Sequence, residues 1–238
     1  MIKRELYMKR IRPFIGNDLI KVMTGVRRAG KSVMLELVQE ELLEAGVSQS
    51  QFICINFENM QYAHLQTAQN LHSEILERAA EIKGKVYLFF DEIQDFPEIA
   101  TALKFFKENG KYDVICSGSL LGVQYQRIAS ISVGYKTDYQ MYSMDFEEFL
   151  WAKGYSEEAI SDMLCHMLEG VAFSEAEQMI FSNLFLEYCI LGGMPAIVSS
   201  YIERETFEGS LDLQHQLLVD YENDIVKYAQ GLDKAKIL

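Results

Sequence analysis

The first half of the chain alternates short apolar runs with segments of helical periodicity. Runs rich in β-branched and aromatic residues predict strands over residues 20–24, 51–57, 86–90 and 112–116. Between these runs, apolar residues at helical spacing predict helices over residues 32–45, 66–82 and 97–109. Strands that alternate with helices in this way predict an α/β fold with a parallel sheet covered by helices.

The pattern changes after Phe146. Four later segments have helical character and none has the pattern of a strand: 149–154, 157–168, 175–191 and 211–229. We therefore place a boundary near Gly154, with an α/β core over residues 1–154 and a smaller all-helical segment over residues 155–238. The last helix shows no closing signal near Leu238, which favours a chain that continues into a further C-terminal domain.

A glycine-rich loop joins the first predicted strand to the first predicted helix. Its sequence GVRRAGKS matches G-x-x-x-x-G-K-[ST], in which backbone N–H groups surround phosphate oxygens at a helix N-terminus. Lys31 is predicted to contact the β- and γ-phosphates during catalysis, and Ser32 to ligate Mg²⁺. A surface turn with an incidental lysine is the alternative, and the strand-loop-helix context disfavours it. The predicted nucleotide-binding residues are Gly25, Val26, Arg27, Arg28, Ala29, Gly30, Lys31, Ser32 and Val33.

Two acidic residues follow the buried strand 86–90. The carboxyl ends of strands in an open α/β sheet are where ligands bind. We predict that Asp91 ligates Mg²⁺ and that Glu92 orients or activates the attacking water. A polar strand end without function is the alternative, which the upstream phosphate loop makes the weaker interpretation.

The strand 112–116 ends in Ser117-Gly118-Ser119, where a hydroxyl could contact the γ-phosphate or the attacking water. We take Ser119 as the catalytic candidate, although Ser-Gly-Ser is also an ordinary turn. Arg127 is a candidate arginine finger and Arg204 a candidate sensor, but a plain surface position explains both better because no spacing selects them.

Charge and composition restrict the partners. The formal net charge is -13, which disfavours nucleic acid and anionic membrane as ligands of this fragment alone. Up to Lys31, however, the chain has nine basic residues and two acidic ones. This cluster suits either a polyphosphate ligand or an amphipathic N-terminal helix with a solvated basic face, and both interpretations stay open.

The chain lacks features of secreted and membrane proteins. Its four cysteines have no metal-type or redox spacing, and they are predicted to be reduced core residues. There is no apolar signal region at the start, and no apolar run reaches the roughly 18 residues of a membrane span. We expect a cytoplasmic protein that does not bind membrane.

Seven segments in order resemble prokaryotic AAA+-type P-loop ATPases of the archaeal-ATPase-like branch. They are VMTGVRRAGKS, INFE, VYLFFDEIQ, ICSGSLLGV, MDFEEFLWAKG, LGGMPAIV and DYENDIVKYA. The resemblance implies an ATPase core, a helical lid-like segment and a further C-terminal domain of unknown function, with ATP and Mg²⁺ as ligands. It gives Gly30, Lys31, Ser32, Asp91 and Glu92 the roles stated above. It identifies no arginine finger, because many relatives carry Gly-Arg-Tyr where this chain has the sequence VGYK.

These observations predict an ATPase that hydrolyses Mg-ATP to drive a conformational change in a protein partner, in a self-assembly or in the further domain. A nucleotide-dependent interaction or DNA-associated module with little turnover is the alternative. A GTPase is disfavoured because the DEIQ segment is not the D-x-x-G switch. A small-molecule kinase shares the phosphate loop, but no second basic cluster for an acceptor phosphate is present.

Overall fold

The computed structural model describes residues 2–119 and 134–228. These residues divide into two compact units. The α/β unit is Tyr7–Tyr142, and the helical unit is Ser143–Asn223 together with the residues up to Leu6. Each unit has its own hydrophobic core.

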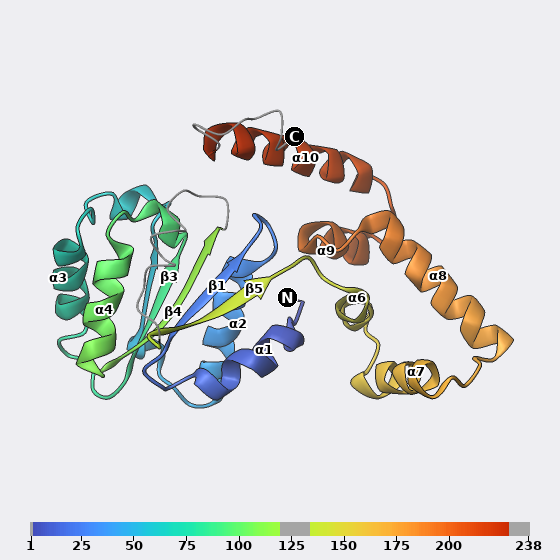
Figure 1. The fold of residues 1–238 in the computed structure, drawn as a ribbon, viewed down its shortest axis with the longest axis horizontal. Coiled ribbons are helices and arrows are strands. Elements are labelled where there is room, and N and C mark those ends of the chain that lie inside the picture. Colours follow the sequence, from blue (N-terminus) through green and yellow to red (C-terminus); the bar gives the residue numbers. More distant parts are fainter. Residues whose placement is uncertain (1, 120–133, 229–238) are drawn as a thin grey trace. The chain divides into compact units, whose positions relative to one another are not determined.

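A parallel sheet forms the centre of the α/β unit (Figure 1). Within the described residues it has five strands in the order β2-β3-β4-β1-β5. The strands are β1 Ile20–Gly25, β2 Phe52–Asn56, β3 Val86–Asp91, β4 Tyr112–Ser119 and β5 Lys136–Met141. Because every neighbouring pair is parallel, the carboxyl ends of all these strands meet at one edge of the sheet.

Helices cover both faces of this sheet. Figure 1 shows α3 and α4 on one face and α2 on the other. Leu88 and Phe90 of β3 pack with Leu71 of α3 and Phe106 of α4 in one buried cluster. The helices are α1 Glu5–Ile11, α2 Lys31–Glu44, α3 Ala68–Arg78 and α4 Ile99–Asn109. Short 3-10 turns are η1 Arg12–Phe14, η2 Gln49–Gln51, η3 Met60–Tyr62 and η4 Ile93–Asp95.

The predicted α/β architecture is confirmed, with one added strand. Strand β5 was not predicted because its sequence KTDYQM is polar, and it lies at an edge of the sheet beside β1. Edge strands tolerate such sequences because one side of the ladder stays unpaired. Strand β4 also continues to Ser119, three residues past its predicted end, and all of it is buried.

The helical unit begins before the predicted boundary. Helix α6 belongs to it, because Phe149 and Leu150 are buried with Leu184 and Val198 in the helical core. The compact units therefore divide at Ser143 rather than near Gly154. Helix α9 is an additional helix that the apolar pattern does not predict. The helices are α6 Phe146–Ala152, α7 Glu157–Glu169, α8 Glu175–Leu191, α9 Pro195–Arg204 and α10 Ser210–Tyr228.

Much of the N-terminal basic cluster is used in the fold. Helix α1 is amphipathic, with Tyr7, Met8 and Ile11 buried, so that interpretation is confirmed for α1. Outside α1, Lys21 pairs with Asp113 in the core of the α/β unit. Arg4 pairs with Glu148 and Arg12 with Glu41, and the phosphate loop and the first turn of α2 carry Arg27, Arg28 and Lys31.

The prediction that the cysteines are core residues is wrong at three of four positions. Cys116 is buried in β4, whereas Cys54, Cys165 and Cys189 are exposed, and all four are free thiols. Apolar neighbours in the sequence do not imply burial, because successive residues of a strand or a helix point to different faces of the element. Among the described residues, no helix is long and apolar enough to cross a membrane.

Candidate functional site

The loop between β1 and α2 has the backbone geometry that its glycines predict. Gly25 ends β1 beside β5, and a Cβ there would lie 2.4 Å from the backbone oxygen of Met141. No side chain fits this space, so the sheet requires glycine. Further along, Arg28 and Gly30 have φ of 65° and 89°, which turn the chain back into α2.

The N-terminus of α2 is open to an anion. Gly30 is the N-cap residue and forms no side-chain cap hydrogen bond. The first amides of a helix have no intrahelical acceptor, and the helix dipole favours negative charge beside them. Ser32 and Val33 are exposed in this first turn. The loop therefore fits a phosphate group.

Lys31 lies between the loop and the acidic pair at the end of β3. Its side chain donates from Nζ to the carbonyl oxygen of Val26 at 3.0 Å, and the residue is 4% exposed. Burial lowers the pKa of Lys31, and the nearby carboxylates of Glu92 and Asp91 oppose this shift. The fold thus brings Lys31 close enough to both predicted acidic residues for their charges to interact.

Three neighbours orient the carboxylate of Asp91. Its Oδ1 accepts hydrogen bonds from the Ser117 hydroxyl and from the Glu92 amide, the latter at 3.0 Å. Its Oδ2 accepts from Asn56 Nδ2 at 3.3 Å, and Asn56 is its register partner on β2. Hydrogen bonds of this kind fix a metal-ligating carboxylate. These hydrogen bonds hold the Asp91 carboxylate in one orientation at the carboxyl end of β3.

A metal at this edge needs oxygen atoms from the nucleotide. Among the described residues, no group of three or more His, Cys, Asp or Glu residues could hold a metal ion. Magnesium is commonly held by one or two protein oxygens together with phosphates and water. The Ser32 hydroxyl and the Asp91 carboxylate fit this type of site.

Glu92 has a constrained backbone and a partly buried carboxylate. Its φ and ψ are 52° and 47°, a left-handed conformation that costs a non-glycine residue about 1–3 kcal/mol. Burial raises the pKa of Glu92, and the charge of Asp91 acts in the same direction. The hydrogen bond from Gln94 and the charge of Lys31 oppose the shift. A raised pKa makes a carboxylate a better proton acceptor.

The two serines that end β4 have different surroundings. Ser117 donates its hydroxyl hydrogen bond to Asp91. Ser119 is the register partner of Gly25, at the start of the phosphate loop, and its backbone amide donates to Gln94 Oε1 at 3.0 Å. Ser119 therefore lies beside the loop, whereas Ser117 supports the predicted metal ligand.

Sequence reasoning missed two polar residues of this site, Asn56 and Gln94. Both lie in segments that carry the family resemblance, INFE and DEIQ, but neither has a spacing that assigns a role. Arg127 lies outside the described residues. Arg204 is exposed in the last turn of α9, in the helical unit.

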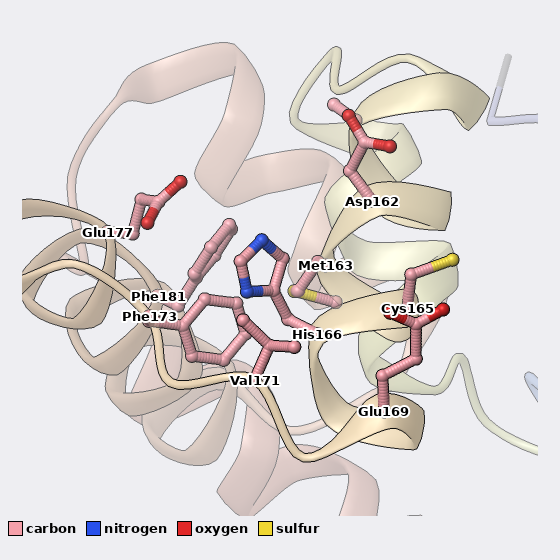
Figure 2. A pocket seen from close by; sticks show the side chains of 10 residues that line it. Asp162, Met163, Cys165, His166, Glu169, Val171, Phe173, Glu177 and Phe181 are labelled. Carbon is pink, nitrogen blue, oxygen red and sulfur yellow. The ribbon is translucent and has the colours of Figure 1, made fainter.

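A separate hollow lies in the helical unit. Figure 2 shows its lining, which includes His166, Phe173 and Phe181. Its volume is about 440 Å³, and none of the predicted site residues lines it. It is therefore not the predicted nucleotide site.

Residues 17–150, more than half of the chain, match the family described as AAA domain. The chain belongs to this AAA domain family. The matched range contains the phosphate loop, Asp91, Glu92 and the β4 exit. The family match and the fold together support an AAA+ P-loop ATPase-like protein.

Two relatives are much longer than the part that matches this chain. An uncharacterized protein of Haemophilus influenzae is 28% identical over 201 residues, which are 83% of this chain and 45% of the relative. An uncharacterized protein of Methanocaldococcus jannaschii is 26% identical over 216 residues, 89% of this chain and 43% of the relative. The chain thus spans less than half the length of these relatives.

Solved structures share the fold. C. elegans PCH-2 has a TM-score of 0.50 at 14% identity, over 82% of this chain and 57% of that one. AMPPCP-bound DnaA from Aquifex aeolicus has a TM-score of 0.50 at 11% identity, over 95% of this chain and 68% of that one. At such identities the likeness concerns the fold alone, and it confirms the AAA+ P-loop fold class.

Proposed function

We propose that this AAA domain binds Mg-ATP at the carboxyl edge of its sheet and hydrolyses it to ADP and phosphate. The amides of residues 25–33 surround the phosphates, and Lys31 contacts the β- and γ-phosphates. Ser32 and Asp91 hold Mg²⁺, which when bound neutralises charge on the phosphate oxygens. Ser119, beside Gly25, contacts the γ-phosphate or the water.

The placement of Lys31 carries this proposal. Lys31 is buried beneath a loop that ends in an uncapped helix N-terminus, so its ammonium group and the first amides of α2 face the same anion-binding position. An ammonium group has three donors, and the Val26 carbonyl accepts from it. Its other donors are suited to phosphate oxygens.

Glu92 supplies the base for hydrolysis. The oxygen of a water attacks the γ-phosphorus as the bond to the β–γ bridging oxygen of ATP breaks. Glu92 accepts the proton that the water releases, and ADP leaves with the bridging oxygen. Burial around Glu92 supports this role because it favours the protonated carboxyl.

Turnover drives a conformational change, in our proposal, that is read by a protein partner, by a second copy of the chain or by the additional region of longer relatives. AAA+ architecture supports this, because nucleotide state can order or displace the elements around a phosphate loop. The acidic composition disfavours nucleic acid as a ligand of this fragment alone.

Glu92→Gln tests the proposed hydrolysis. The variant keeps the side-chain volume but loses the proton acceptor, so ATP affinity should persist and phosphate release should fall about 100-fold or more. Exposed Glu36 on α2 provides the matched control, because Glu36→Gln removes the same charge away from the β3 end. Equal phosphate release by wild type and Glu92→Gln contradicts the proposal. No phosphate release by wild type that binds ATP favours a nucleotide-dependent interaction module instead.

A further inference from the structure

Gln94 is a buried polar residue whose amide bonds at both ends. It lies in turn η4, two residues after Glu92, and is 7% exposed. Its Nε2 donates to Glu92 Oε2, with a longer contact of 3.5 Å to Asp95 Oδ2. Its Oε1 accepts from the backbone amide of Ser119 at 3.0 Å. One side chain therefore connects the predicted base to the end of β4.

The turn that carries Gln94 packs directly on β4. A Cβ at Gly118 would lie 2.9 Å from Ile93 Cγ1 and 3.1 Å from Gln94 Oε1. The backbone of Gly118 does not have a left-handed φ, so this close approach is the reason that glycine fits here. A contact this tight transmits small displacements, because packed interiors are not compressible.

A neutral amide suits a neighbour of a base. A lysine or arginine at this position would hold the carboxylate in an ion pair and weaken it as a proton acceptor. The amide instead orients one oxygen, Glu92 Oε2, and leaves Oε1 for a water. Glu92 is thus constrained at two points. Its backbone has a left-handed conformation, and its carboxylate accepts the hydrogen bond from Gln94.

We propose that Gln94 is a positioning residue, which aims Glu92 at the attacking water and couples that aim to the position of the β4 exit at Ser119. The inference rests on the proposed hydrolysis and deepens it. Movement of the β4 exit withdraws the partner of Gln94 Oε1, and Glu92 then turns away from the water. Turnover thus depends on the contact between Gln94 and the β4 exit, while the contacts of residues 25–33 with the nucleotide do not.

Gln94→Met is the first test, because methionine keeps the length of the side chain and removes the amide. A misplaced base costs turnover, and we expect kcat for phosphate release to fall about 10- to 100-fold. The Kd for a nonhydrolysable ATP analogue should stay unchanged. Gln39→Met is the matched control, because the amide of Gln39 donates to the Leu35 carbonyl within α2.

Gly118→Ala is the second test, and it changes the β4 side of the contact with Gln94. The added methyl group would press on Gln94 Oε1 and Ile93, so kcat should fall with little change in Kd. If the two sites act through one contact, Gly118→Ala in the Gln94→Met background should lower kcat much less than it does alone. Amide exchange at Ser119 should also accelerate in folded Gln94→Met, because its acceptor is gone.

The outcomes are distinguishable. Unchanged kcat in Gln94→Met, with active wild type, overturns the positioning role and leaves the proposed function intact. If Gly118→Ala lowers kcat by the same factor in the Gln94→Met background as in wild type, the coupling to β4 is overturned. If wild type binds ATP without releasing phosphate, the proposed hydrolysis and the positioning role both fail. If Gln94→Met does not fold, Gly118→Ala decides whether Gln94 positions Glu92. A lower kcat with an unchanged Kd supports that role, and an unchanged kcat overturns it.

Discussion

Replacing Lys31 by methionine tests the centre of the proposed nucleotide site. Methionine has nearly the length of lysine but carries no charge, so the core around α2 keeps its volume. In the free protein the ammonium donates to the Val26 carbonyl at 3.0 Å and lies beside Asp91 and Glu92. The variant removes the phosphate contact and also leaves both carboxylates without their counter-charge.

The expected magnitude follows from these contacts. Hydrogen bonds to a charged group contribute about 1.5–3 kcal/mol, and the low exposure of Lys31 favours the upper part of that range. Repulsion between the phosphates and the unpaired carboxylates adds to the loss. We therefore expect Mg-ATP binding to weaken by about 2–3 kcal/mol, which corresponds to about 30- to 150-fold in Kd.

Isothermal titration of wild type and variant with Mg-ATP measures this change directly. Lys107→Met is the matched control, because Lys107 pairs with Asp18 near the end of α4 and its loss removes the same charge. The control should bind ATP like wild type. A Kd within about threefold of wild type for Lys31→Met would refute the reasoning, since the charged contact would then contribute less than about 0.7 kcal/mol.

Other predictions address the metal, the folded state and the thiols. Ser117→Ala removes the hydroxyl that supports the predicted metal ligand, so the Mg²⁺ concentration for half-maximal phosphate release should rise about tenfold, and an unchanged Mg²⁺ titration would contradict this support. Arg4→Met breaks an ion pair with Glu148 whose side chains are 3% and 2% exposed, so the free energy of unfolding should fall by about 3–5 kcal/mol. Urea titration followed by circular dichroism, which reports on both compact units, measures this loss. Arg12→Met in an exposed pair should cost about 0.5 kcal/mol, and equal costs would refute the argument from burial. A thiol reagent should label the exposed cysteines in the native protein but Cys116 only after unfolding. Burial raises the pKa of the Cys116 thiol and excludes the reagent. Labelling of Cys116 in the native protein, detected by mass spectrometry, would contradict this prediction.

The sequence alone determined the elements that depend on local patterns. Strand β1, the glycine loop and helix α2 follow one another within 25 residues, from Ile20 to Glu44, so apolar spacing and backbone requirements were enough to predict them. The apolar run of β3 likewise predicted a buried strand that ends in Asp91 and Glu92. A parallel sheet then places these ends at one edge, which is why Lys31 could be assigned to the same site as the acidic pair.

The tertiary structure decided which polar residues support that site. Asn56 contacts Asp91 because β2 pairs with β3, and Ser117 contacts it because β4 pairs with β3 on the other side. Gln94 contacts Ser119 because Gly118 allows the turn η4 to pack on β4. Strand order and close packing set these contacts, and neither is encoded in the spacing of residues along one segment.

The same reason explains two of the architectural differences. The polar β5 is stable as an edge strand because β1 supplies its hydrogen-bond partners, and α6 joins the helical unit because its aromatic face is buried there. Local propensity is a small free energy for each residue, whereas pairing and burial act between residues far apart in the chain. The sequence therefore determined the phosphate loop and the acidic pair, and the packing of distant segments decided what holds them in place.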